Sequence, residues 1–259
     1  MQDIHKKISS NLETLMTKKR KVIIFSDIDG TIMSHNNYSV GSFRETMNIL
    51  KSHKIIVSPV TSKTVSELEA LQEQLNFCGP LVAENGGIIA DFGLISNSNH
   101  QYDVDYHQKE IAEILNGLPK TILSQMKRFS ELSTTEIQAI TKLNFPLAER
   151  ARMRLASEAF LWTGDSDTEQ KLSKYLDEKH LRMVKGGRLY HAIGRRDKAA
   201  ASKQIIHSLT VSDSASKLEV WALGDAENDL SLLKLADKKA IIRNTKINQS
   251  YLLKTVKNA

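Results

Sequence analysis

A continuous apolar run that ends at two acids constrains the fold of this chain more than any other feature. Residues 22–25 read Val-Ile-Ile-Phe, and Asp27 and Asp29 follow almost at once. Such a run predicts a strand buried on both faces, which is typical of a parallel sheet covered by helices. Ligands of open α/β sheets bind at the carboxyl ends of the strands. Two carboxylates so close together repel each other unless a proton or a cation separates them, which favours a hard ion such as Mg²⁺.

Two other interpretations of this acidic turn compete with a metal site. Asp-rich turns often do no more than begin a helix. An EF-hand loop would need glycine at its sixth position and glutamate at its twelfth, where this chain has Ile32 and Tyr38. The EF-hand is therefore excluded, whereas these residues alone leave the helix-capping alternative open.

Strand-like runs and helix-like segments alternate through the first third of the chain. The strand-like runs are 55–60 and 81–83, and the segments with the apolar spacing of helices are 41–52 and 64–75. This alternation predicts a parallel sheet with right-handed crossovers, and hence an α/β fold with a Rossmann-like core. The pair Asn85-Gly86, which lies between apolar residues, is also typical of a hairpin.

In the middle of the chain, helical and polar character replaces this alternation. We predict helices at 108–115, 120–132, 133–143 and 167–180, and strands at 154–162 and 181–184. The change indicates a second, α+β domain inserted into the first. We place this cap domain at 93–187 and the discontinuous core at 1–92 and 188–259. A strand at 188–193 is predicted to return the chain to the core.

Three further polar signals stand in positions equivalent to that of the first acidic turn. Thr61 follows the second strand run, Lys198 opens a helix, and the strand predicted at 218–223 ends in the sequence GDAEND, which contains Asp225 and Asp229. Each has an ordinary explanation when taken singly; a lysine near a helix start, for example, is commonly solvated. Because the carboxyl ends of parallel strands meet at one edge of a sheet, we expect these groups to lie together.

Taken in order, these motifs resemble the haloacid dehalogenase (HAD) superfamily of phosphotransferases, over residues 22–90 and 188–243. The resemblance implies that Asp27 is the nucleophile and that Asp29 acts as general acid and base. It also implies that Thr61 and Lys198 bind the phosphoryl oxygens. Phosphoryl transfer requires neutralised charge and in-line attacking and leaving oxygens, which such a set would supply.

The same resemblance implies a Mg²⁺ ion and a set of residues that hold it. In the superfamily the metal contacts the side chain of the first aspartate, the backbone carbonyl of the second and an acid of the last motif. These positions correspond to Asp27, Asp29 and Asp225. Asp229 is expected to bind directly or through water, with Asn228 to orient it.

The predicted insert resembles the type IIB caps of this superfamily, which implies that it closes over the site and selects the substrate. Several phrases are more narrowly similar to the mannosyl-3-phosphoglycerate phosphatases: TSKT at 61–64, ENGG at 84–87, RLASEAFLW at 154–162 and KGGRLYHAIGRRDKAAA at 185–201. That family usually has proline and glycine where this chain has Ala159 and Ala199. The implied partner is a small molecule, a phosphorylated sugar-glycerate.

A phosphoglycerate carries a carboxylate beside its phosphate, and an arginine fork binds a carboxylate well. Arg188 is our candidate for this contact, with Lys63, Asn85 and His191 as further substrate-binding candidates. Each of them could equally be an ordinary surface or strand residue.

Composition narrows the remaining classes of function. A formal charge of +6 suits an acidic ligand, but an aromatic content of 6% and the lack of a basic run interleaved with aromatics argue against nucleic acid. No apolar run approaches the length of a membrane span. A single cysteine, Cys78, favours a reducing compartment, and we predict the cytoplasm. Residues 4–15 have the spacing of an amphipathic helix that docks on the core.

Three alternatives to mannosyl-3-phosphoglycerate hydrolysis stay open at this point. The chain could hydrolyse another sugar phosphate, such as glucosyl-3-phosphoglycerate. It could be a phosphotransferase that resembles phosphomannomutase, which shares the cap type. It could also be a phospho-acceptor signalling domain, although the large insert and Asp29 disfavour that class.

Overall fold

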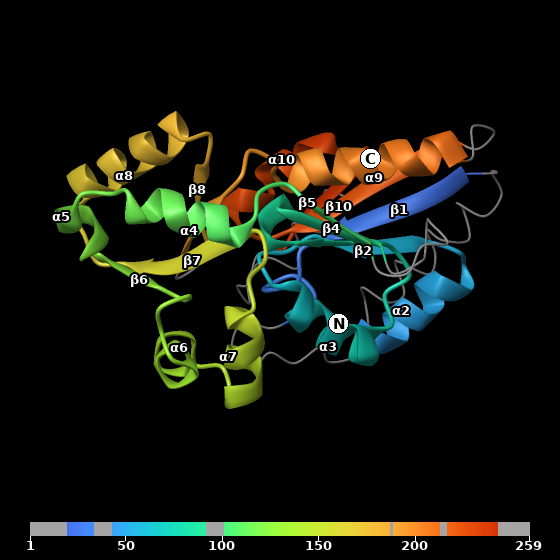
Figure 1. Cartoon of the computed structure of the whole chain (residues 1–259). Coiled ribbons are helices and arrows are strands. Elements are labelled where there is room, and N and C mark those ends of the chain that lie inside the picture. The colour runs from blue at the N-terminus through green and yellow to red at the C-terminus, as the bar shows by residue number, and fades with distance from the viewer. Residues whose placement is uncertain (1–19, 34–42, 92–100, 187–188, 213–216, 243–259) are drawn as a thin grey trace.

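The computed structural model describes residues 20–33, 43–91, 101–186, 189–212 and 217–242 (Figure 1). The helix predicted near the N-terminus and the candidate Arg188 lie outside these residues. Among the helices that are described, none is long and apolar enough to cross a membrane.

A parallel four-stranded sheet forms the core of the chain. Its order is β11-β10-β1-β2, and all neighbouring strands pair in parallel. The strands are β1 (Arg20–Ser26), β2 (Ile56–Pro59), β10 (Lys217–Gly224) and β11 (Lys238–Ile241). β1 lies in the middle because it is apolar on both faces, as its sequence predicts.

Alternate residues of β1 point to opposite sides of this sheet and seed two separate cores. Val22 and Ile24 pack in one apolar cluster with α2 (Phe43–Ser52) and α3 (Val65–Leu75). Ile23 and Phe25 pack in another with α9 (Lys198–Ser212) and α10 (Leu230–Leu235). Helices therefore cover both faces, as Figure 1 shows, and the predicted α/β, Rossmann-like fold is confirmed.

A small antiparallel sheet extends this core. It consists of β3 (Leu81–Ala83), β4 (Ile88–Asp91) and β5 (Gln101–Val104) in that order. A parallel bridge between Val60 and Val82 joins it to the end of β2. β3 and β4 form a hairpin across the short 3₁₀ turn η1 (Glu84–Gly86), so the hairpin alternative for Asn85-Gly86 is correct.

A second four-stranded sheet, antiparallel throughout, lies apart from the parallel one (Figure 1). Its order is β6 (Met126–Arg128), β7 (Ser157–Trp162), β9 (Tyr190–Ile193) and β8 (Arg182–Lys185). The helices α4 (Gln108–Asn116) and α8 (Ser166–Glu178) share an apolar cluster with it, and α6 (Thr134–Thr141) and α7 (Phe145–Arg152) share another. The one-turn helix α5 (Lys120–Leu123) precedes β6. We call residues 105–193 the insert.

Three predictions for this region are wrong. The strand predicted to return to the core at 188–193 is β9, which pairs with β7 and β8 of the insert sheet. The segment 101–104, assigned to the insert, is β5 and pairs with β4. The helix predicted at 120–132 ends at Leu123 and is followed by β6. A short apolar run suits either sheet, so its partner cannot be inferred from the run itself.

Candidate active site

Asp27 lies immediately after β1, at the edge of the parallel sheet where the strands end. Its N–H donates to the carbonyl of Leu223 on β10 at 2.9 Å, which continues the strand pairing by one residue. The chain then turns back over the carbonyl of Ile28, which accepts N–H groups from three residues, 31 to 33. The turn buries Ile28 and leaves the Asp29 side chain partly exposed beside the sheet edge.

Lys198 is the first residue of α9, and its ammonium group lies between two carboxylates. Its Nζ donates to Asp27 Oδ1 at 2.8 Å and to Asp229 Oδ1 at 2.6 Å, and all three side chains are buried. Burial by itself lowers the pKa of Lys198, but the charges of Asp27 and Asp229 outweigh it and raise this pKa above its usual value. Lys198 therefore carries its charge inside the protein and links the first acidic motif to the last.

Burial also decides the protonation of Asp27. It raises the pKa of this carboxyl from 3.8 to about 7, an effect that Lys198 opposes and that the neighbouring Asp229 reinforces. A carboxyl with such a pKa changes charge near neutral pH, so its ionised form depends on the cations around it.

The last acidic motif folds into a tight turn at the end of β10. Asp229 Oδ2 accepts the N–H groups of Asp225 at 3.1 Å and Ala226 at 3.2 Å. Gly224 permits this approach, because a Cβ atom there would lie 2.5 Å from the Cβ of Asp229. Both carboxylate oxygens of Asp229 are thus engaged within the protein, which fits a supporting role better than a direct ligand role.

Asp27, Asp225 and Asp229 form a group that could hold a metal ion. Each offers one carboxylate oxygen, and these oxygens lie within 4.8 Å of one another. An all-oxygen donor set of this kind suits Mg²⁺, so the residues present fit the ion that the family resemblance implies. The side chain of Asp29 is outside this group. We expect Asp29 to contact the metal ion through its backbone carbonyl, and that contact stays a prediction.

Lys63 links the segment that follows Thr61 to the turn that carries Asp29. Its Nζ lies 3.1 Å from Asp29 Oδ2 and 3.4 Å from Glu67 Oε1. Burial by itself lowers the pKa of Lys63, but these two acids together raise it above its usual value. Thr61 is fully buried, and Thr61 Oγ1 accepts the N–H of Lys63 at 3.3 Å. Lys63 therefore sits among the acids of the site.

Asn85 and His191 are also buried near these residues. Asn85 Oδ1 accepts Nδ2 of Asn228 at 3.2 Å, which places it against the last motif. Burial lowers the pKa of His191 well below its ordinary value, and the nearby charges of Arg154 and Lys198 add to the effect. This histidine is therefore neutral at physiological pH, which leaves one ring nitrogen able to accept a hydrogen bond.

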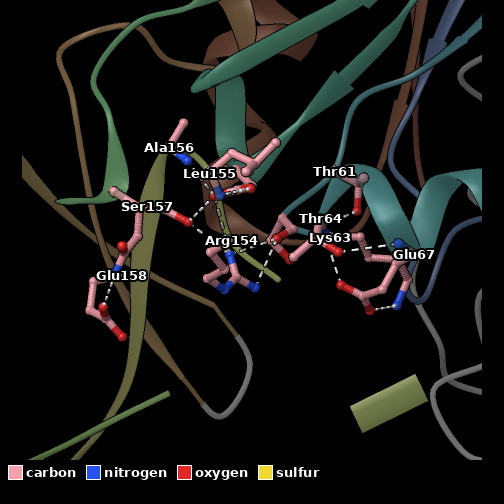
Figure 2. Close-up of polar contacts among 12 residues, drawn as sticks. Thr61, Lys63, Thr64, Glu67, Arg154, Leu155, Ala156, Ser157 and Glu158 are labelled. Carbon is pink, nitrogen blue, oxygen red and sulfur yellow. Dashed lines mark hydrogen bonds and ion pairs between the residues drawn. The ribbon is translucent and has the colours of Figure 1, made fainter. Parts of the chain in front are cut away.

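Arg154, which we did not predict, reaches from the insert to the core. Its guanidinium group donates to the carbonyl of Ser62 at 3.4 Å and to Ser157 Oγ at 2.8 Å (Figure 2). Arg154 lies in the phrase RLASEAFLW, so the sequence resemblance marked its neighbourhood, but nothing in the sequence indicates that its side chain points toward the core.

Several buried polar atoms around the site have no hydrogen-bond partner among the described residues. They include Asp29 Oδ1, Thr31 Oγ1, Asn85 Nδ2, Arg154 Nε and His191 Nδ1. A buried polar atom without a partner costs about 1–3 kcal/mol unless a ligand or water satisfies it. Their concentration here is what a binding site for a polar molecule would show.

Comparisons with known proteins agree with this geometry. The haloacid dehalogenase-like hydrolase family matches residues 24–248. A glucosyl-3-phosphoglycerate/mannosyl-3-phosphoglycerate phosphatase of Persephonella marina is 27% identical. The alignment covers 89% of this chain and 87% of that protein. A protein of the same name from Methanococcoides burtonii is 28% identical over 92% of each chain. The solved structure of a HAD subclass IIB sugar phosphatase aligns with a TM-score of 0.59 at 13% identity over 91% of both chains.

The family match spans most of the chain and includes each motif singled out from the sequence. The predicted HAD resemblance and the expectation of a hydrolytic enzyme are thereby confirmed. The names of the relatives agree with the expected class, a phosphatase. The chain belongs to the haloacid dehalogenase-like hydrolases.

Proposed function

We propose that this chain is a Mg²⁺-dependent phosphomonoester hydrolase that acts through an aspartyl-phosphate on Asp27. The observation that carries the proposal is the arrangement around Lys198, whose ammonium group binds Asp27 and Asp229 while Asp225 lies within ligand distance of both. A phosphoryl group needs a nucleophile, cations and a rigid anion-binding edge, and this edge of the sheet combines all three.

The proposed reaction has two steps. An oxygen of Asp27 attacks phosphorus, and the bond from phosphorus to the substrate oxygen breaks as Asp29 donates a proton to that oxygen. Asp29, now ionised, takes a proton from water, which attacks the phosphorus of the aspartyl-phosphate and releases inorganic phosphate and free Asp27. Oδ2 of Asp29 is held by Lys63, whereas Oδ1 has no partner among the described residues and could serve the leaving group.

The polar residues of the site and the metal ion have separate tasks in this proposal. Lys198 and Thr61 contact the phosphoryl oxygens, and Lys198 keeps Asp27 oriented at 2.8 Å before the substrate arrives. Asp27 and Asp225, with the Asp29 carbonyl and support from Asp229, would hold Mg²⁺. The bound ion would neutralise charge on the transferring phosphoryl group.

The proposed substrate is mannosyl-3-phosphoglycerate or glucosyl-3-phosphoglycerate, which the names of the two relatives support. The insert at 105–193 would be the cap domain that binds the sugar-glycerate part. Arg154 and His191, on the insert side, each carry a nitrogen without a hydrogen-bond partner in the described part of the chain, and these could bind a carboxylate and hydroxyls. Such a substrate and a single cysteine fit an enzyme of the cytoplasm.

We expect phosphate release from mannosyl- or glucosyl-3-phosphoglycerate, with 3-phosphoglycerate and simple sugar phosphates turned over more slowly. The reason is that the smaller compounds make fewer contacts with the insert, so less binding energy is available in the transition state. A phosphate-release screen with and without Mg²⁺ measures this. Activity confined to nucleotides would contradict the proposed substrate, and a phospho-protein that lasts for hours would favour a signalling domain.

We further expect Mg²⁺ to bind more weakly as the pH falls through 7. Because its pKa in the folded protein, about 7, lies above its ordinary value of 3.8, Asp27 binds its proton more tightly in the folded than in the unfolded chain. In the metal-free protein this stabilises the fold fully below pH 3.8, and the contribution is lost progressively as the pH rises from there through 7.

A proton on Asp27 competes with the metal, so the apparent dissociation constant of Mg²⁺ should rise as the pH falls. Well below pH 7 it should rise about tenfold for each pH unit. Calorimetric titration of metal-free protein across this range tests the prediction. Asp27→Asn should bind Mg²⁺ weakly with little dependence on pH. A steep pH dependence in that variant would assign the titrating group elsewhere.

A further inference from the structure

The loop 84–87, between β3 and β4, contacts the insert on one side and the candidate active site on the other. Its residues Glu84 and Asn85 have left-handed backbone conformations, with φ of +51° and +59°. Two such residues in succession are uncommon outside glycine and persist only where the surroundings hold them in place. The contacts on the two sides of this loop are therefore informative.

On the insert side, the carboxylate of Glu84 accepts three hydrogen bonds. Oε1 accepts the N–H of Leu155 at 2.9 Å, and Oε2 accepts the N–H of Ala156 at 3.1 Å and the hydroxyl of Ser157 at 2.5 Å. The Arg154 guanidinium lies 4.0 Å away. Glu84 is fully buried, so a carboxylate of the core is wholly engaged by the chain that enters β7. Figure 2 shows Arg154 between Leu155, Ala156 and Ser157 on one side and the segment that carries Thr61 and Lys63 on the other.

On the core side, the same residues hold the phosphate-binding motif. The N–H of Glu84 donates to the carbonyl of Lys63 at 2.9 Å, and the N–H of Asn85 donates to the carbonyl of Thr61 at 2.8 Å. Asn85 also accepts the side-chain amide of Asn228 at 3.2 Å. A shift of Glu84 would therefore disturb the contacts that this loop makes with Thr61, Lys63 and Asn228.

The rest of the loop is held by the two connections that join the insert to the core. Arg196 donates from Nε to the carbonyl of Gly86 at 2.7 Å and from Nη2 to that of Gly87 at 2.9 Å. The N–H of Asp105 donates to the same Gly87 carbonyl at 2.9 Å. Gly86 also packs on the start of α9, where a Cβ would lie 2.9 Å from the nitrogen of Lys198. Both connections and the entry to β7 thus meet at one loop.

We propose that Glu84 is a positioning residue that sets the insert relative to the phosphate-binding residues, so that a substrate held by both is aligned for attack. The inference rests on the proposed phosphatase function, in which the insert binds the organic part of the substrate. Glu84 acts through the backbone of Leu155 and Ala156 and through Asn85, and it does not touch the substrate.

The test compares Glu84→Gln with a matched variant, Glu158→Gln. An amide at residue 84 would turn one acceptor oxygen into a donor that faces a backbone N–H group, which leaves buried donors unsatisfied. Glu158 is likewise buried and accepts Gln108 Nε2 at 2.7 Å and the N–H of Ser130 at 3.0 Å, but all of these residues belong to the insert. The two changes therefore damage similar hydrogen bonds, and only one of them joins the insert to the core.

The first readout compares two substrates, mannosyl-3-phosphoglycerate and the small compound para-nitrophenyl phosphate. In Glu84→Gln we expect kcat/KM to fall at least about tenfold for the sugar-glycerate and less than about threefold for the small compound. A purely structural defect would lower both by the same factor, because it only reduces the amount of folded enzyme. Glu158→Gln should leave the ratio of the two values unchanged.

The second readout is hydrogen exchange of assigned backbone amides, which does not depend on activity. We expect protection of Leu155 and Ala156 to fall at least about tenfold in Glu84→Gln and to persist in Glu158→Gln, where Ser130 should lose protection instead. If Glu84→Gln does not fold, Ser157→Ala removes one of the three donors and should show the same changes at smaller size.

Equal losses for both substrates, or unchanged protection at 155 and 156, would overturn the role of Glu84. If the wild-type chain hydrolyses neither compound, the proposed function fails, and the exchange measurement still decides whether Glu84 ties the insert to the core.

Discussion

Asp27→Asn is expected to lower phosphate release by at least about 10³-fold while the protein stays folded. The amide oxygen is too weak a nucleophile to form the covalent intermediate, so the two-step route is lost. The fold should survive because Lys198 keeps its contact with Asp229 at 2.6 Å, and because the change removes the repulsion between the Asp27 and Asp229 carboxylates. Steady-state rates on the best substrate of the screen, with circular dichroism of the same samples, measure both parts.

Asp177→Asn is a suitable control for this variant. Asp177 is an exposed acid of α8 that pairs with the exposed side chain of Arg195, and its loss should leave the rate unchanged. Deamidation of Asn to Asp would restore the wild-type residue, so mass spectrometry of the variant should exclude it. Residual activity of Asp27→Asn above a few per cent would then mean that another residue is the nucleophile.

Lys198→Met is expected to destabilise the metal-free protein by about 3–5 kcal/mol and to reduce activity severely. Removing the ammonium group leaves the carboxylates of Asp27 and Asp229 buried and facing each other without a cation between them. Added Mg²⁺ should recover part of this stability in the variant, because the ion again separates the two charges. Urea unfolding with and without Mg²⁺ gives the free energies of unfolding.

Lys238→Met provides the comparison, because Lys238 also pairs with a carboxylate but lies near the surface. Its Nζ is 3.1 Å from Glu219, and its side chain is 39% exposed. The loss should cost less than in Lys198→Met, because the Lys238 side chain is partly open to water and Glu219 keeps a hydrogen bond from Trp221 Nε1 at 2.9 Å. A similar small cost for Lys198→Met would mean that the ammonium group of Lys198 does little to stabilise the buried pair, and the proposed role of Lys198 as a charged partner would be wrong.

The core of the fold could be predicted because its signals are local. The apolar run before Asp27 is a strand, and the helices that follow have clear apolar faces, so the parallel sheet was accessible from the pattern. The run at 81–83, which we predicted for the same sheet, pairs instead with β4 in the antiparallel one. The insert was less accessible. The run at 190–193 looks like a buried strand in either sheet, and only its pairing with β7 and β8 places it in the insert.

In the candidate site, too, residues marked by a local pattern could be predicted, and residues whose roles depend on long-range contacts could not. Asp27, Thr61, Lys198 and Asp225 each follow a strand or open a helix, so their shared edge could be expected. Arg154 and Glu84 could not be assigned in this way, because their roles depend on contacts between segments about 70 residues apart, such as the one between Glu84 and Leu155. No local spacing encodes such a contact.

By itself, the sequence determined the kind of sheet, the residues at its carboxyl edge and the family to which the chain belongs. Each of these depends on short-range pattern, where a few neighbouring residues suffice to specify a strand, a turn or a motif. Only the tertiary structure decided that Lys198 lies between Asp27 and Asp229, that β9 pairs within the insert and that Glu84 binds the backbone of 155–156. These contacts form because buried charges and donors require partners, and the folded chain decides which partners are within reach.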